Sequence, residues 1–305
     1  MRLWARDPAL AARIESQRAN AFYLPDVRFP PTLHATGDLA GALAGADLVI
    51  AAMPSHGTRD ILRRAAHLVL PGTIVVSATK GLEVDTLFRV SEIVDQELRG
   101  VRSAVLSGPS FAVEVARGLP TAVCIASADA EVVAVVQADF KSPYLRLYGT
   151  DDVIGVELGG ALKNVIAIAA GVVEGLGLGH NAIAGLITRG LAEISRLACA
   201  AGAKRETLAG LTGLGDLVLT CTGTLSRNRH VGIELASGRQ IGDVLRDMKT
   251  VAEGVRTTEA ALALASRYGV ELPIASQVAE LLAGRKDART ALGELMLRPQ
   301  RSEAG

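Results

Sequence analysis

Lys163 has the surroundings that most clearly indicate chemistry in this 305-residue sequence. It lies in an apolar stretch, and Gly159 and Gly160 precede it by one turn of the predicted helix, so no bulky side chain crowds its face. Burial in such surroundings lowers the pKa of a lysine and suits it to exchange a proton near neutral pH. A lysine whose stem packs on a core helix while its ammonium reaches water would give the same pattern.

Two further groups of polar residues follow predicted strands, where ligands bind in open α/β sheets. Lys80 comes after the predicted strand Thr73–Ser77 and could contact an anionic substrate, although a solvated loop lysine is the simpler interpretation. The segment Ser107–Ser110 follows another strand and begins a helix at Pro109, so its backbone N–H groups could bind an anion. Helix capping by its serines is the alternative, and both can hold at once.

Ser226, Arg227 and Asn228 stand at the start of a predicted helix. An arginine binds phosphate through paired hydrogen bonds and a helix N-terminus attracts anions, so these residues could form a phosphate site. A capped surface helix with Ser226 as its N-cap is the usual meaning of such a tripeptide. Asp216 lies in the glycine-rich turn Thr212–Leu217, where an N-cap is again the simpler interpretation.

The elements that must position these residues change in kind near Thr150. Before it, strand and helix patterns alternate, which is typical of a doubly wound parallel sheet. The predicted strands are Arg2–Ala5, Asp47–Met53, Thr73–Ser77, Ser103–Leu106, Ala122–Ala126 and Leu145–Tyr148, and the helices among them are 7–19, 56–66 and 86–98. From Asp151 onward only helices are predicted, over 152–174, 181–201, 226–237, 254–267 and 274–283. We therefore expect an α/β domain over residues 1–149 and an all-α domain over 150–305.

Composition narrows the class of protein. The 32 basic residues balance the 32 acidic ones, which argues against a nucleic-acid-binding protein, and 49% hydrophobic residues exclude a disordered chain. The three cysteines lie far apart without a Cys/His cluster, so neither disulfides nor a metal site is predicted and a cytoplasmic setting fits. The N-terminus lacks the apolar core of a signal peptide, and the apolar run Val165–Val173 is too short to span a membrane. The apolar helical domain favours a homodimer.

A doubly wound nucleotide-binding domain should carry the pattern GxGxxG between its first strand and first helix, and the first half of the chain has none. The similar pattern over Gly177–Ala182 follows a helix, so we expect a helix–helix turn there. Because Arg2–Ala5 already looks like a second strand, we expect the chain to begin after a first strand, glycine loop and helix. A mis-started reading frame is the expected cause, and a short protein with weak cofactor binding is the alternative.

Eight short motifs occur in an order that resembles one enzyme family. They are Leu3–Pro8 (LWARDP), Tyr23–Pro25 (YLP), Ser77–Leu82 (SATKGL), Leu106–Ala112 (LSGPSFA), Glu157–Asn164 (ELGGALKN), Gly213–Leu217 (GLGDL), Ser226–Asn228 (SRN) and Val251–Gly254 (VAEG). Over residues 1 to about 285 the chain resembles the bacterial NAD(P)-dependent glycerol-3-phosphate dehydrogenases, apart from the missing glycine-loop segment. The resemblance implies a Rossmann domain followed by an all-α domain. It also implies interconversion of dihydroxyacetone phosphate and sn-glycerol 3-phosphate, which supplies the glycerophospholipid backbone.

The resemblance further implies roles for individual residues. Lys163 would be the catalytic residue and accept the proton in the oxidation direction. The residues implied at the substrate are Lys80, Gly108, Ser110, Lys163, Asp216, Ser226, Arg227 and Asn228. The residues implied at the cofactor are Tyr23, Lys80, Ala112, Arg227, Val251 and Glu253. Asp216 would hold Lys163 oriented and cationic.

Arg6 determines the expected choice of cofactor. An acidic residue after the second strand would bind the ribose 2′-hydroxyl of NAD, whereas Arg6 stands near that place and suits the 2′-phosphate of NADP. Asp7 reads as a helix cap before Pro8. We therefore expect NADP(H), with NAD(H) as the second option. Two other functions remain open: a related 3-hydroxyacid dehydrogenase or ketopantoate reductase, and a catalytically silent ligand-binding module.

Overall fold

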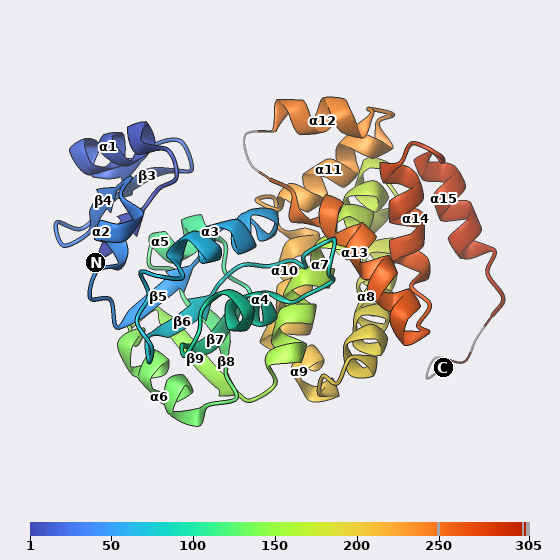
Figure 1. The fold of residues 1–305 in the computed structure, drawn as a ribbon. Coiled ribbons are helices and arrows are strands. Elements are labelled where there is room, and N and C mark those ends of the chain that lie inside the picture. Colours follow the sequence, from blue (N-terminus) through green and yellow to red (C-terminus); the bar gives the residue numbers. More distant parts are fainter. Residues whose placement is uncertain (249–250, 301, 303–305) are drawn as a thin grey trace.

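The computed structural model describes residues 1–248, 251–300 and 302. All of its strands lie before residue 151, and the described residues after that point contain helices only. Figure 1 shows the sheet-containing part beside the helical part, with the long helix α7 (Val153–Gly175) entering the helical part directly after the last strand. The expected order of an α/β part followed by an all-α part is therefore confirmed.

The first part alternates short strands and helices. Its strands are β1 (Arg2–Trp4), β2 (Ala19–Asn20), β3 (Leu24–Arg28), β4 (His34–Thr36), β5 (Leu48–Ala51), β6 (Ile74–Ser77), β7 (Arg102–Ser107), β8 (Thr121–Ala126) and β9 (Leu145–Thr150). Its helices are α1 (Pro8–Gln17), α2 (Leu39–Leu43), η1 (Ser55–Gly57), α3 (Thr58–Ala65), α4 (Val90–Glu97), α5 (Ala112–Ala116) and α6 (Ala130–Asp139). Asp7 caps α1 by accepting a hydrogen bond from the N–H of Ala9, with Pro8 at the first helical position, as the sequence indicated.

Five strands form the main sheet in the order β5-β6-β7-β8-β9. Strands β5, β6 and β7 are parallel to one another, and every residue of β6 is buried, as expected for a strand covered on both faces. One pair departs from the expected parallel arrangement, because β8 runs antiparallel to β7. The connection over residues 108–120 contains only the five-residue α5, which does not return the chain to the start of β7 as a longer crossover would.

The remaining strands lie outside this sheet. Strands β1 and β4 form a parallel pair of their own, and β2 pairs with β3 in an antiparallel hairpin that the sequence did not predict. The guanidinium of Arg64, in the last turn of α3, lies 5.8 Å from the ring centre of Trp4 on β1 and links the two groups of strands. The single expected sheet is therefore present in two pieces, which Figure 1 shows with β4 and α1 set apart from β5.

The second part is a helical bundle around α7. Its other helices are α8 (Gly179–Ala200), α9 (Arg205–Ala209), the π-helical turn η2 (Leu211–Gly215), α10 (Asp216–Thr222), α11 (Arg227–Ala236), α12 (Ile241–Asp247), α13 (Glu253–Tyr268), α14 (Pro273–Leu282) and α15 (Ala288–Met296). The side chain of Asp152 caps α7 through the N–H of Gly155, 2.8 Å away. Every residue of α7 from Gly155 to Val173 is buried, which makes it the central helix of the main core cluster.

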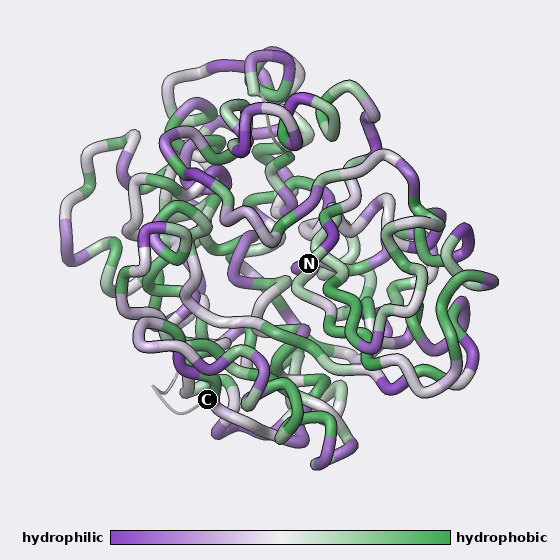
Figure 2. Tube along the Cα trace, turned by 90° about the vertical axis from the view of Figure 1, so that its left-hand side faces the viewer, coloured by the Kyte–Doolittle hydropathy of each residue, from purple (hydrophilic) through white to green (hydrophobic). Residues whose placement is uncertain are grey.

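The apolar run Val165–Val173 belongs to a longer helix, α7. By length and composition alone this 23-residue helix could cross a membrane, as could the bent pair Arg205–Thr222 and Arg227–Ala236 if it is taken as one span. However, 83% of the most apolar window of α7 is buried inside the protein, as in a core helix. In Figure 2 hydrophobic and hydrophilic residues alternate along much of the trace, as they do in amphipathic elements around a core.

A close helix crossing brings α11 onto α7. A Cβ on Gly171 would lie 1.9 Å from the carbonyl oxygen of Arg229, and a Cβ on Gly232 would lie 1.9 Å from that of Ile168. Only glycine at both positions permits this approach, which carries Asn228 to the buried polar residues of α7.

The helix α4 begins at Val90 rather than Thr86, since the preceding Leu87 adopts a positive φ of 64°. Gly177 and Gly179, with φ of 70° and 80°, lie at the expected turn between α7 and α8.

Candidate active site

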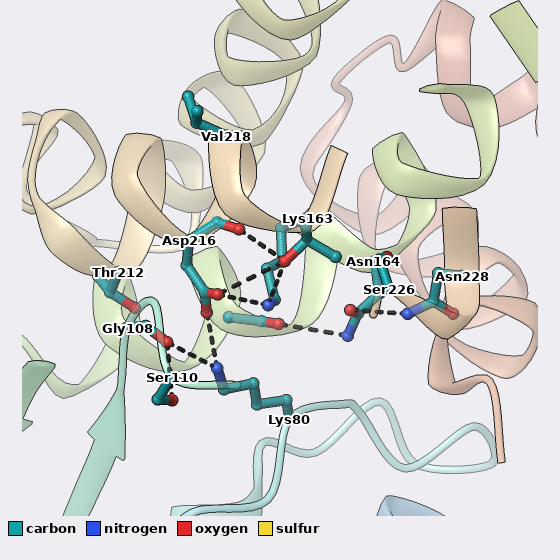
Figure 3. Close-up of polar contacts among 12 residues, drawn as sticks. Lys80, Gly108, Ser110, Lys163, Asn164, Thr212, Asp216, Val218, Ser226 and Asn228 are labelled. Atoms are coloured by element: carbon teal, nitrogen blue, oxygen red, sulfur yellow. Dashed lines mark hydrogen bonds and ion pairs between the residues drawn. The ribbon is translucent and has the colours of Figure 1, made fainter. Parts of the chain in front are cut away.

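Three neighbouring parallel strands deliver polar groups to one edge of the sheet. Ser55, Lys80 and Gly108 lie just beyond the carboxyl ends of β5, β6 and β7, where ligands bind in sheets of this kind. The Nζ atom of Lys80 donates hydrogen bonds to the carbonyl oxygen of Gly108 at 3.0 Å and to Oδ2 of Asp216 at 2.7 Å. Ser110 also donates to the Gly108 carbonyl, at 3.1 Å. This edge therefore faces the helical part directly (Figure 3).

The helical part contributes a buried lysine to the same place. Lys163 on α7 is 6% exposed, and its Nζ donates to Oδ1 of Asp216 at 2.5 Å and to Oγ1 of Thr220 at 2.7 Å. Asp216, 1% exposed, is the first residue of α10 and follows the π-helical turn η2. Thr220 lies one helical turn further on and donates to the backbone carbonyl of Asp216 at 2.6 Å. Figure 3 shows the Asp216 carboxylate between the ammonium groups of Lys80 and Lys163.

The electrostatics of this cluster set the protonation of Lys163. Burial is the main cause that lowers the pKa of Lys163, to about 7, and the neighbouring Lys80 lowers it further. Asp216 acts in the opposite direction, because a nearby carboxylate favours the ammonium form. The expected preference of Asp216 for a cationic Lys163 is thus present, but burial and the second lysine outweigh it. The amine can therefore both give and take a proton near neutral pH.

Gly160 allows the two parts of the site to approach. A Cβ at this position would lie 2.5 Å from Oγ of Ser107 and 3.7 Å from Cγ of Lys80. The glycine therefore makes room for the end of β7 and for the Lys80 stem. The sequence predicted only that the helix face beside Lys163 lacks bulky side chains, and the structure shows which residues occupy that space. Ser107 itself is 2% exposed, and its hydroxyl has no hydrogen-bond partner within the described part of the chain.

A second polar group lies beside Lys163. Asn228 on α11 donates to Oδ1 of Asn164 at 2.9 Å and accepts a hydrogen bond from the N–H of Gly254 at 2.9 Å. Ser226 caps α11 by accepting from the N–H of Arg229 at 3.3 Å, as the simpler interpretation of this serine required. Arg227, the first residue of α11, is exposed and has no recorded hydrogen bond or ion pair with any residue in the described part of the chain.

The predicted cofactor residues are spread more widely. Arg6 is exposed at the bend between β1 and α1, and Tyr23 is 52% exposed in the β2–β3 hairpin, where it packs edge-on against Phe22. Ala112 is the exposed first residue of α5. Glu253 is the first residue of α13 and contacts Ser55, and Val251 lies two residues before this helix. None of these residues has a recorded contact with the Lys163 cluster within the described ranges.

Sequence reasoning missed several residues that the structure brings into the site. Asn164 follows Lys163 in the same motif, and Thr220 stands four residues after Asp216, a spacing that places two side chains on one helix face. The position of Asn164 next to Lys163 and the four-residue spacing of Thr220 from Asp216 could have indicated these two residues. Ser55 gave no such signal, because its partner Glu253 is 198 positions away.

The fold and the site together define a class of protein. A sheet with polar groups at the carboxyl ends of its parallel strands, closed by a buried lysine from a helical domain, is the arrangement of a two-domain oxidoreductase that uses a nicotinamide cofactor. The polar groups at this edge, among them the Lys80 ammonium, are of a kind that a nicotinamide cofactor could contact. Among the residues that the structure describes, no group of three or more His, Cys, Asp or Glu could hold a metal ion.

Comparison with known proteins identifies the family. Residues 1–133 match the family of the NAD-dependent glycerol-3-phosphate dehydrogenase N-terminus, and residues 152–293 match that of the C-terminus. A glycerol-3-phosphate dehydrogenase [NAD(P)+] from Geobacter metallireducens is 50% identical over 99% of this chain and 91% of its own length. The crystal structure of glycerol-3-phosphate dehydrogenase from Coxiella burnetii, 40% identical, superposes with a TM-score of 0.94 over 97% of this chain and 91% of that one. The chain belongs to the NAD(P)-dependent glycerol-3-phosphate dehydrogenase family.

Ketopantoate reductases, which belong to the first alternative function, share only the fold with this chain. A ketopantoate reductase from Ralstonia eutropha is 16% identical and has a TM-score of 0.53 over 95% of this chain. Such a likeness reflects a common architecture, and the substrate is decided by the site rather than the fold. The family matches across both parts of the chain therefore favour the phosphate-bearing substrate.

Proposed function

We propose that this chain interconverts dihydroxyacetone phosphate and sn-glycerol 3-phosphate with NAD(P)H, and that Lys163 exchanges the proton. The single observation that carries this proposal is the buried Lys163 with a pKa lowered to about 7, held by Asp216 and Thr220. The product would supply the backbone of glycerophospholipids. When bound, the nicotinamide supplies or accepts the hydride.

The proton transfer follows from the position of Lys163. Reduction of the ketone leaves an alkoxide, and the Lys163 ammonium donates a proton to that oxygen. In the oxidation direction, the neutral Lys163 amine accepts the proton of the substrate hydroxyl. Asp216 and Thr220 accept hydrogen bonds from Nζ and so fix its direction. Lys80 contributes a second positive charge that stabilises the developing oxyanion.

The substrate phosphate would bind at the start of α11. Arg227 is exposed and free to form paired hydrogen bonds with a phosphate, while Ser226 and Asn228 flank it. The positive end of the ten-residue helix adds to the attraction. We assign Lys80, Gly108, Ser110 and Asp216 to the carbinol end of the substrate, because these residues gather beside Lys163.

The cofactor would lie across the carboxyl ends of the parallel strands. We assign Lys80, Arg227, Val251 and Glu253 to its nicotinamide end, and Arg6, Tyr23 and Ala112 to its other contacts. We further propose that Arg6 favours NADP(H) over NAD(H) by binding the 2′-phosphate. Arg6→Ala should then raise the KM for NADPH and leave that for NADH unchanged, with Arg13→Ala on the exposed side of α1 as the matched control. Equal effects on both cofactors would refute this assignment.

The organisation of the protein completes the proposal. We place the domain boundary between residues 149 and 150, at the end of β9. We propose a homodimer in the cytoplasm, formed through the helical domain, where Leu214, Val218 and Leu225 are exposed apolar residues. Sedimentation at several protein concentrations tests the dimer, and a single monomeric species at micromolar concentration would refute it.

The activity is tested by the loss of NADPH absorbance when dihydroxyacetone phosphate is added to the purified chain. Turnover in the wild type, together with its loss in Lys163→Ala, supports the proposal. A soluble, folded wild type without turnover contradicts it. Binding of sn-glycerol 3-phosphate without turnover would instead indicate a catalytically silent ligand-binding protein.

A further inference from the structure

One contact joins the two domains beside the Lys80 loop. The backbone N–H of Ser55 donates to Oε1 of Glu253 at 3.2 Å, and its hydroxyl donates to Oε2 at 2.5 Å. Ser55 follows β5 and is 5% exposed, whereas Glu253 is the first residue of α13. Both oxygens of one carboxylate are therefore held by a single serine of the other domain.

The contact is packed directly against Gly81, the residue after Lys80. A Cβ on Gly81 would lie 2.7 Å from both Cβ and Oγ of Ser55 and 3.2 Å from Oε2 of Glu253. Any larger residue at position 81 would displace Ser55 and Glu253, so Gly81 and Ser55 together leave just enough room for the Glu253 carboxylate. This packing lies next to the loop from which Lys80 reaches Asp216.

A second contact between the domains also joins a serine to a glutamate carboxylate, but it includes an arginine. Glu157 on α7 accepts hydrogen bonds from the N–H of Ser91 at 2.8 Å and from its hydroxyl at 2.6 Å. Glu157 is 6% exposed and also pairs with Arg89, whose Nη1 lies 2.7 Å away. Glu253 has no recorded cationic partner among the described residues. Arg89 thus offsets the buried charge at the Ser91 contact, whereas the Ser55 contact leaves the Glu253 charge available beside the proposed cofactor position.

We infer that Ser55 is a positioning residue for the cofactor: with Gly81 it holds the Glu253 carboxylate at the nicotinamide end of the site. This inference rests on the proposed function, which assigns Glu253 to the cofactor. Ser55 acts only through Glu253. Loss of its hydroxyl leaves the carboxylate with one weaker hydrogen bond, so that Glu253 has to be ordered when the cofactor binds.

The test measures the Kd for NADPH of the full chain by its fluorescence, without turnover. Ser55→Ala and Glu253→Ala should each weaken binding by roughly 10-fold, within the loss typical of one hydrogen bond to a charged group. The double variant should bind as weakly as Glu253→Ala alone, because residues that act through one another are not additive. Ser91→Ala is the matched control: it removes the same kind of hydroxyl–carboxylate bond and should lower the melting temperature while leaving the Kd unchanged.

The outcomes separate a failure of the cofactor assignment of Glu253 from a failure of the positioning role of Ser55. Unchanged binding in Glu253→Ala, or no NADPH binding by the wild type, refutes the cofactor assignment and with it the inference. Weakened binding in Glu253→Ala with normal binding in Ser55→Ala overturns the inference alone. Ser55 has no specific role through Glu253 if the losses of NADPH affinity multiply in the double variant. The same conclusion follows if Ser91→Ala loses as much affinity as Ser55→Ala. Gly81→Ala provides a second variant, and its added methyl should weaken binding by displacing the pair.

Discussion

Lys80 and Asp216 join the two domains at the centre of the site: Nζ of Lys80 lies 2.7 Å from Oδ2 of Asp216, although 136 positions separate them in the chain. The other oxygen of the same carboxylate accepts from Lys163. One buried acid is thus shared by two lysines, one from each domain. Burial is the main cause that lowers the pKa of Lys163 to about 7, and the neighbouring Lys80 lowers it further, so that the Asp216 carboxylate only partly offsets the two effects.

Replacement of Lys163 should remove catalysis and preserve the fold. Lys163→Ala is expected to lower kcat by about 10²- to 10⁴-fold, the usual contribution of a general acid–base group. The variant should still bind NADPH, since Lys163 donates to Asp216 and Thr220 and is not itself one of the proposed cofactor residues. Steady-state rates and circular dichroism measure the two effects. Near-normal turnover in a folded variant would exclude Lys163 as the acid or base.

The pH dependence should have opposite signs in the two directions. Reduction of dihydroxyacetone phosphate needs the Lys163 ammonium, so kcat/KM should fall as pH rises through about 7, whereas oxidation should rise over the same range. Asp216→Asn removes the charge that raises the pKa of Lys163, so the reduction profile should shift to lower pH. The substrate phosphate titrates identically with both proteins, so the difference between their profiles reports the enzyme. Superimposable profiles would contradict the role of Asp216.

Arg227 should act on the substrate phosphate. Arg227→Ala is expected to raise the KM for dihydroxyacetone phosphate by roughly 10- to 100-fold, because a charge-assisted pair of hydrogen bonds is lost. Its exposed guanidinium has no recorded partner in the described ranges, so thermal stability should not change. Arg267→Ala, at the exposed end of α13, is the matched control and should leave KM unaltered. An unchanged KM in Arg227→Ala would rule out the phosphate contact.

Stability should depend on pH through Glu193. This carboxyl on α8 is 4% exposed and accepts hydrogen bonds from the N–H groups of Ile274 and Ala275 at the start of α14. Burial raises its pKa to about 7, so its contribution to stability is complete below pH 4.5 and is lost as pH rises through 7. Glu193→Gln should therefore be the more stable protein at pH 8, by on the order of 1–3 kcal/mol. Parallel melting curves from pH 5 to 8 for the two proteins would contradict this.

Much of the architecture could be predicted because it is encoded locally. The apolar run of β6, the Asp7–Pro8 start of α1 and the long apolar helix around Lys163 are each specified by neighbouring residues and their periodicity. Short elements such as α5 and the β2–β3 hairpin gave weaker patterns and were missed. The motif order was also sufficient to indicate the family, since it needs no knowledge of spatial contacts.

The sequence by itself determined the two kinds of domain, the apolar helix that carries Lys163 and the family, because short-range patterns of polarity and capping suffice for these. Only the tertiary structure decided that Asp216 faces two lysines, that β8 reverses direction and that Ser55 holds Glu253. These features depend on how elements far apart in the chain pack together. The pKa of Lys163 belongs to this second group, since it reflects burial and the charge of Lys80, neither of which can be read from spacing along the chain.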